Sequence, residues 1–292
     1  QWCELKDYSN QKGIKIIGDM PIYVAADSVE VWTKPELFQL DKERNPLFVA
    51  GVPADQFSAT GQLWGNPLYD WEEHKKQGYA WWIHRIEESF KIYDVLRIDH
   101  FKGFSDYWQV DGKADIAKDG SWQPGPGYDL FKAVKEQLGD LPIIAEDLGN
   151  IDDKARKLLA DCNYPGMKIL QFGFEDVSGK SLDSPHYCIP HSIVYTGTHD
   201  NDVTNGWYNG LTEQQQQYIN DYTHRHEDES ICQAMIRQLF ATVSNTAIAM
   251  MQDVLDLPAS SRMNVPSTIG GNWQWRMQAV SYTHLRAHET GR

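Results

Sequence analysis

Three acidic side chains in this 292-residue sequence, Asp99, Glu146 and Asp200, each follow a short apolar run. The parallel strands of an α/β barrel are apolar along their length and carry catalytic groups at their carboxyl ends. Two carboxyl groups that flank one bond are the minimum for glycoside chemistry, and a third can stabilise the positive charge of the transition state. A single acid of this kind could simply cap the following helix. Three such strand ends suggest one active site.

Arg97 lies two residues before Asp99, so alternation along a strand places both side chains on the same face. A guanidinium in this position favours the ionised form of the carboxylate, which suits attack on an anomeric carbon. An ordinary strand-end ion pair is the alternative interpretation.

The elements that must position these acids alternate between strand and helix about six times, which is typical of parallel β/α architecture. The segment from Pro21 to about Tyr79 is rich in Pro, Gly, Asn and aromatic residues, which predicts a long irregular insertion of functional importance. Apolar spacing predicts helices over residues 2–11, 80–92, 128–138, 151–162 and 231–244. The apolar runs that we expect as strands cover residues 14–19, 94–99, 142–147, 167–172, 192–200 and 247–251.

Composition limits the class of partner. The formal net charge of −14 argues against nucleic acid or an anionic membrane surface, and a neutral polar substrate is compatible with it. Aromatic residues make up 12% of the chain; such rings stack on sugars, although we expect at least half of them to pack in the core.

The four cysteines are scattered without a C-x-x-C pair, which indicates neither a zinc site nor a disulfide framework and favours a reducing compartment. No apolar run reaches the roughly 18 residues that span a bilayer, so we expect a soluble, cytoplasmic protein. His224 and His226 could form a metal site, but residues two apart do not share a helix face, and a solvated loop is the simpler interpretation.

The segments that carry these acids resemble a known family. RIDHFKGF (97–104), AEDLG (145–149) and GTHDN (197–201) look like the strand-end motifs of the 4-alpha-glucanotransferases (amylomaltase or disproportionating enzyme) of glycoside hydrolase family 77. The spacings of 47 and then 54 residues between the acids also fit that family. Residues 18–24, 51–58 and 61–69 fit it too, and the resemblance extends to about residue 277.

The resemblance implies roles for individual residues. Asp99 would be the nucleophile, Glu146 the acid/base and Asp200 the stabiliser of the transition state. The substrate-binding residues that it implies are Arg97 and His199 in the donor subsite, Asp19 and Trp64 in the substrate cleft, and Asn201. For Trp64, a buried loop anchor is an equal alternative.

The resemblance also implies an α/β fold, the (β/α)8 barrel of the α-amylase superfamily, over residues 1–280 with the insertion at about 21–79. The barrel would be incomplete, because the family has about two more β/α units before this segment, and we expect the chain alone not to be a competent enzyme. Residues 281–292 do not match the family and are expected to be a foreign or frame-shifted tail. Lys102 stands where Arg is more usual, and Ser267 where Gly is more usual.

The implied function is transfer of α-1,4-glucan segments to the 4-hydroxyl of an acceptor glucan or glucose by a retaining double displacement. Such an enzyme acts on maltooligosaccharides, starch or glycogen and requires no metal or organic cofactor. A hydrolase of the same superfamily and a non-catalytic glucan-binding fragment remain as alternatives. We expect the insertion to favour transfer over hydrolysis, because rings in it could stack on an acceptor sugar and exclude water: Phe57, Trp64, Tyr69 and Trp71.

Overall fold

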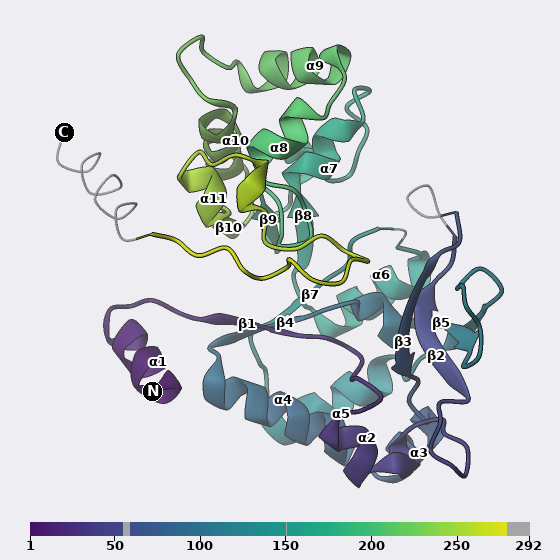
Figure 1. The fold of residues 1–292 in the computed structure, drawn as a ribbon. Coiled ribbons are helices and arrows are strands. Elements are labelled where there is room, and N and C mark those ends of the chain that lie inside the picture. The colour runs from purple at the N-terminus through teal and green to yellow at the C-terminus, as the bar shows by residue number, and fades with distance from the viewer. Residues whose placement is uncertain (55–58, 150, 279–292) are drawn as a thin grey trace. The chain divides into compact units, whose positions relative to one another are not determined.

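The computed structural model describes residues 1–54, 59–149 and 151–278. Phe57 and the expected tail, residues 281–292, lie outside the described residues. The chain divides into two units, the first ending at Gly166 and the second beginning at Met167. Each unit has a three-stranded sheet and a buried core of its own (Figure 1).

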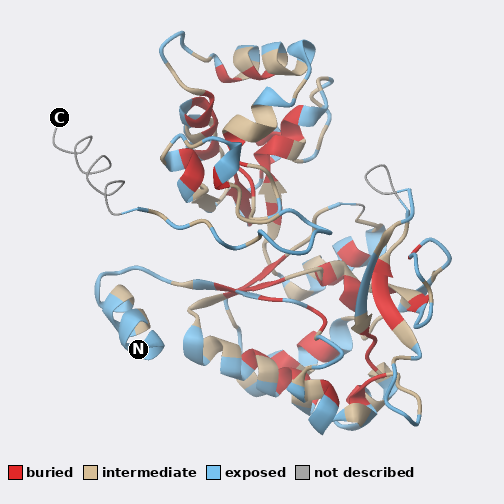
Figure 2. Cartoon of the chain, viewed as in Figure 1, coloured by how far each residue is buried: buried red, intermediate tan, exposed pale blue. Residues whose placement is uncertain are grey.

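A parallel sheet lies at the centre of the first unit. Its strands are β1 (Ile17–Met20), β4 (Val95–Ile98) and β7 (Ile143–Ala145), in the order β1-β4-β7. The expected strands are confirmed here, and burial explains their apolar sequences: Figure 2 shows β4 and β7 largely in red, with Leu96 and Ile98 fully buried. Because the strands are parallel, their carboxyl ends meet at one edge of the sheet.

The predicted helices precede, connect or follow these strands. They are α1 (Trp2–Gln11), α4 (Ala80–Ile92), α5 (Tyr128–Leu138) and α6 (Asp153–Cys162). The apolar positions of α4 and α5 recur every three or four residues, so that each helix buries one face in the core of the unit. The short helices of the insertion are α2 (Val29–Thr33), η1 (Pro35–Leu37) and α3 (Trp71–Lys76), and η2 (Phe101–Phe104) follows β4.

The insertion contains strands, which corrects the expectation of an irregular segment. β2 (Phe48–Val52) and β3 (Gln62–Pro67) form an antiparallel sheet with β5 (Asp106–Asp111) and β6 (Ser121–Pro124), in the order β3-β2-β5-β6. The β2–β3 pairing shifts register between Val49 and Gly51, which marks a β-bulge or another irregularity in this pair of strands. Pairing with β5, a distant segment, therefore stabilises strands whose own sequences carry turn signals.

Aromatic rings fill the core between the insertion and α4. Tyr69 is 1% exposed, and its hydroxyl donates a hydrogen bond to the carbonyl of Ile22 at 2.7 Å. Its ring packs against Trp71, Trp81 and Trp82. The expectation that Tyr69 stacks on an acceptor sugar is therefore wrong, because the ring is enclosed in the core.

His74 lies inside this aromatic cluster. It is 1% exposed, with its imidazole against the rings of Tyr69, Trp71 and Trp81. Burial lowers the pKa of His74 from 6.5 to about 4. Because this pKa is lower in the folded than in the unfolded chain, protons bind preferentially to the unfolded chain. The neutral ring thus contributes stability that is fully present above about pH 6.5 and is lost as the pH falls towards 4.

We expect His74→Phe to reduce this acid sensitivity. Between neutral pH and about pH 4, the unfolding free energy of the parent should fall by up to about 3 kcal/mol more than that of the variant. Urea unfolding of the full-length protein at several pH values measures the difference. His84→Gln changes an exposed histidine and serves as the control. Equal pH dependence of parent and His74→Phe would contradict the assignment.

The second unit is built on β8 (Gly166–Ile169), β9 (Ser192–Tyr195) and β10 (Thr246–Ile248), in the order β10-β9-β8, with β10 parallel to β9. Two expected strands are shorter than predicted, because the apolar runs continue into helices: α7 begins at Leu170 and α11 at Met251. The helices of the second unit are α7 (Leu170–Glu175), α8 (Thr204–Asn209), α9 (Glu213–Thr223), α10 (Ile231–Phe240) and α11 (Met251–Val254). Two short 3-10 helices, η3 (Pro185–Tyr187) and η4 (Ala259–Ser261), complete it.

Among the described residues, no helix combines the length and the apolar character needed to cross a membrane.

Candidate active site

A buried guanidinium joins two of the predicted acids in the first unit. Arg97, on β4, donates from one terminal nitrogen to Oδ1 of Asp19 at 2.6 Å and from the other to Oδ1 of Asp99 at 2.7 Å. The parallel register pairs Asp19 with Arg97, and alternation puts Asp99 on the same face, so both contacts follow from the strands. Burial alone would lower the pKa of Arg97, but the surrounding carboxylates raise it. The guanidinium therefore stays positively charged.

Glu146 follows β7, and backbone groups hold both of its carboxylate oxygens. Oε2 accepts the N–H of His100 at 2.8 Å, and Oε1 accepts the N–H of Leu148 at 2.7 Å. Burial, and then the nearby Asp99 carboxylate, raise the pKa of Glu146 to about 7, against the opposing effects of Arg97 and the two N–H groups. Near neutral pH, Glu146 can therefore both give and accept a proton, as an acid/base residue must.

Trp64, in β3, contacts the residue that follows Asp99. Its ring makes an edge contact with the imidazole of His100 at a centroid distance of 4.8 Å and also contacts Tyr23. The side chain is 37% exposed, so Trp64 is neither a fully buried loop anchor nor a free surface ring. The exposed part of this side chain, next to the residue that follows Asp99, is available to a ligand.

The remaining predicted residues follow β9 in the second unit. Nε2 of His199 lies 3.4 Å from Oδ2 of Asp200. Oδ1 of Asp200 accepts a hydrogen bond from the side-chain amide of Asn264 at 2.7 Å, and Arg262 donates to the backbone carbonyl of Asp200. Oδ1 of Asn201 accepts the N–H and the hydroxyl of Thr198, so this side chain fixes the turn that carries the other two.

A pocket in the second unit opens beside this turn. The ring of His199 lies 5.1 Å from the ring of Trp273, which gives the pocket an aromatic wall. The residues that line it are Thr198, His199, Asn201, Val203, Met250, Gln252, Met263 and Trp273. A wall of one imidazole and one indole suits the apolar face and the hydroxyls of a sugar.

The structure divides the predicted site residues between the two units. Asp19, Trp64, Arg97, Asp99 and Glu146 belong to the first unit, where direct or electrostatic contacts link the charged ones. The second unit contributes the group around β9: His199, Asp200 and Asn201.

Sequence reasoning missed the partners that orient these acids. His100 binds Glu146 through its backbone N–H, which no side-chain pattern could indicate. Asn264 binds Asp200 from 64 residues further along the chain. Its only signal was its place near Ser267, within the part of the chain that resembles the family. Trp273 likewise lies in an aromatic stretch that carried no assigned role.

The structure shows the surroundings of the two residues that depart from the family pattern. Nζ of Lys102 binds the carboxylates of Asp106 and Asp152 rather than a proposed catalytic acid, and Asp152 also caps α6 through the N–H of Ala155. Lys102 thus connects the segment after β4 to the helix after β7. Ser267 has a φ of +61°, a backbone conformation that Gly adopts without strain, which accounts for the usual Gly.

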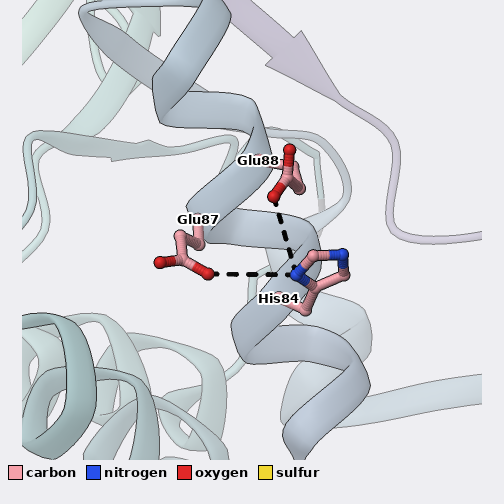
Figure 3. Close-up of side chains that lie close together, drawn as sticks. All are labelled: His84, Glu87 and Glu88. Atoms are coloured by element: carbon pink, nitrogen blue, oxygen red, sulfur yellow. Dashed lines mark ion pairs between the residues drawn. The ribbon is translucent and has the colours of Figure 1, made fainter.

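Among the described residues, one group of side chains could hold a metal ion, on the surface of α4. Nδ1 of His84 lies 3.8 Å from Oε2 of Glu87 and 3.7 Å from Oε1 of Glu88 (Figure 3). All three side chains are exposed, and Lys91 pairs with the same oxygen of Glu88. These features describe the charged solvent face of a helix. Within the described parts of the chain, His224 belongs to no such group and instead ends α9.

Comparisons with known proteins agree with the motifs. The chain is 54% identical over 278 residues to the 4-alpha-glucanotransferase of Streptococcus pneumoniae, covering 95% of this chain and 55% of that protein. It is 46% identical over 293 residues to the 4-alpha-glucanotransferase of Clostridium butyricum, covering 99% and 60%. The chain therefore spans little more than half the length of these relatives.

A solved structure is similar over nearly the whole chain. It is the amylomaltase from Streptococcus agalactiae in complex with acarbose, with a TM-score of 0.96 and 59% sequence identity, covering 98% of this chain and 58% of that one. The family model described as 4-alpha-glucanotransferase, glycoside hydrolase family 77, matches residues 1–282. The chain belongs to this 4-alpha-glucanotransferase family.

Proposed function

We propose that the protein that contains this chain transfers α-1,4-glucan segments between glucan chains by a retaining double displacement. The observation that carries the proposal is the pair formed by Asp99, bound to Arg97, and Glu146, whose buried carboxyl has a pKa of about 7. One carboxylate held by a cation and one carboxyl poised to lose its proton match the nucleophile and the acid/base of a retaining glycosidase.

In the first step, Asp99 attacks the anomeric carbon of the donor while Glu146 protonates the leaving glycosidic oxygen. The bond between that carbon and oxygen breaks, and a glucosyl ester forms on Asp99. In the second step, Glu146 removes the proton from the 4-hydroxyl of the acceptor, which displaces Asp99 and restores both groups. Asp200 stabilises the positive charge that develops on the sugar. The two carboxyl groups should then lie roughly 5 to 5.5 Å apart when the substrate is bound.

The substrate-binding roles rest on placement and on the similar structure. In the first unit, Arg97 and Asp19 form an ion pair, and Trp64 is partly exposed next to His100. In the second unit, His199 and Asn201 line a pocket with an aromatic wall. Because the similar amylomaltase was solved with acarbose, we infer that these residues bind α-1,4-linked glucose units.

We further infer that residues 1–280 belong to a catalytic (β/α)8 barrel of the α-amylase type, with the insertion at about 21–79. Two sheets with parallel strands and intervening helices support this inference. The proposed work of the enzyme is maltooligosaccharide, starch or glycogen metabolism in the cytoplasm. The four free cysteines are consistent with a reducing compartment.

The decisive test is the product pattern from maltotriose. The full-length protein should convert maltotriose into glucose and a ladder of longer oligosaccharides, resolved by chromatography. Hydrolysis would instead yield glucose and maltose without longer products. A parent protein that gives only shorter sugars, or no product, would refute the proposed transfer activity.

Trp64→Ala should shift the balance from transfer towards hydrolysis. Water and a sugar hydroxyl compete for the glucosyl ester on Asp99, and transfer prevails only if the acceptor is held in place. We expect the ratio of ladder products to hydrolysis products to fall about tenfold. Trp32→Ala, which removes another exposed tryptophan of the insertion, is the control. If total turnover falls while the ratio stays constant, Trp64 is only a packing residue.

A further inference from the structure

His100 directly follows the proposed nucleophile and has an unusual backbone conformation. Its φ of +50° and ψ of +49° lie in the left-handed region, which few residues other than Gly adopt. In this conformation the backbone N–H of His100 points at Oε2 of Glu146, 2.8 Å away. The orientation of one carboxylate oxygen of the proposed acid/base thus depends on the backbone of His100.

The same short segment also holds the main chain of Glu146. The N–H of Glu146 donates to the carbonyl of Ile98 at 3.0 Å, and the N–H of Phe101 donates to the carbonyl of Glu146 at 3.1 Å. Residues 98–101 therefore fix both the backbone and the side chain of Glu146. A change in the backbone conformation at His100 would disturb the N–H groups of His100 and Phe101, which hold the carboxylate and the carbonyl of Glu146.

The imidazole of His100 lies close to two neighbours. The ring of Trp64 is 4.8 Å away at an interplanar angle of 89°. The ring also lies against Gly103, where an added Cβ would come within 3.0 Å of Cδ2 of His100. Burial lowers the pKa of His100 to about 4, so at neutral pH the ring packs as an uncharged aromatic group.

These contacts form one connected chain from the insertion to the acid/base: Trp64 contacts the ring of His100, and the backbone of His100 holds Glu146. We infer that His100 is a positioning residue through which Trp64 sets the orientation of the Glu146 carboxyl group. The inference rests on the proposed function and deepens it. It connects the side of the site that receives the acceptor with the group that must deprotonate that acceptor.

The test compares two donors in the full-length protein. Maltotriose needs Glu146 as acid and base, whereas α-maltotriosyl fluoride with azide as acceptor needs neither, because fluoride leaves without a proton and azide attacks without losing one. We expect His100→Gly, which removes the ring and relaxes the backbone, to lower kcat on maltotriose about tenfold to a hundredfold with little change in KM. Fluoride release with azide should fall less than about threefold.

Two further variants separate positioning from packing. His100→Phe keeps a ring between Trp64 and Gly103, so it should recover most of the kcat on maltotriose. The double variant with Trp64→Ala and His100→Gly should lose little more of the kcat on maltotriose than His100→Gly alone, since both changes interrupt the same connection. His224→Gly is the matched control, because His224 has nearly the same backbone angles, φ +48° and ψ +49°, at the exposed end of α9. It should leave both activities unchanged.

The inference is overturned if His100→Gly leaves maltotriose turnover unchanged, or if the losses in the double variant simply add. It is also overturned if both donors lose activity equally. Should His100→Gly lose both because it does not fold, His100→Asn, which tolerates the left-handed conformation, decides the matter by the same two assays. A parent protein that makes no ladder from maltotriose refutes the proposed function itself, which distinguishes the two failures.

Discussion

Asp99→Asn and Glu146→Gln, made separately in the full-length protein, are each expected to lower kcat on maltotriose by about a thousandfold or more. Asp99→Asn removes the oxygen that would form the covalent ester, and Glu146→Gln removes the proton that the leaving oxygen needs. Both replacements keep nearly the same shape, and the lost interactions act mainly in the transition state. Binding of maltotriose, measured by calorimetry, should therefore change little.

The two variants should differ in their activity with an activated donor and an added nucleophile. Glu146→Gln should regain turnover with α-maltotriosyl fluoride and azide, which need no proton transfer, whereas Asp99→Asn should not. Asp129→Asn and Glu87→Gln, on exposed helix faces, are matched controls that should retain parent activity. Near-parent turnover in either active-site variant would refute its assigned role.

Arg97→Met is expected to damage both stability and activity. The variant leaves the carboxylates of Asp19 and Asp99 facing each other without the cation that binds both. Removing one partner of a fully buried ion pair costs roughly 3–5 kcal/mol, but these carboxyl side chains are 45% and 42% exposed, so about 2 kcal/mol is a better expectation. We expect kcat to fall about a hundredfold, because Asp99 loses its fixed orientation.

Arg97→Lys should have an intermediate effect. A single ammonium group lacks the planar fork that reaches two carboxylates at once. Urea unfolding and maltotriose turnover measure the two losses. Arg156→Met removes an exposed arginine that pairs with Asp153 on α6, and it should change neither quantity. If Arg97→Met changes stability and turnover as little as Arg156→Met does, the ion pairs of Arg97 contribute no more than those of an exposed arginine.

The central strands could be predicted because their signals are local. An apolar run that ends in a carboxylate marks β4 and β7, and the two-residue spacing of Arg97 and Asp99 fixes their common face. The hydrophobic pattern also located α4 and α5, since each buries one face against the same core. In these elements the local preference agrees with the tertiary structure.

The features that escaped prediction depend on partners distant in sequence. β2 pairs with β5, whose strand begins only after β4. Tyr69 is buried in the core and cannot stack on a sugar, and its hydroxyl is hydrogen-bonded to the carbonyl of Ile22, 47 residues away. The backbone N–H groups of His100 and Leu148 that bind Glu146 could not be predicted from the types of these residues. A sequence can therefore name the acids of this site but not the groups that orient them.

The antiparallel sheet has a consequence for how this part of the chain can be exchanged between relatives. Val49 on β2 pairs with Val110 on β5, so the strands of this sheet lie on both sides of β4 in sequence. During synthesis, β2 and β3 must wait for β5 before their sheet is complete, and this closure spans about 60 residues. A chimera that replaces only residues 21–79 would pair a foreign β2 with the resident β5. Grafts that alter acceptor preference should therefore carry residues 106–124 together with the insertion.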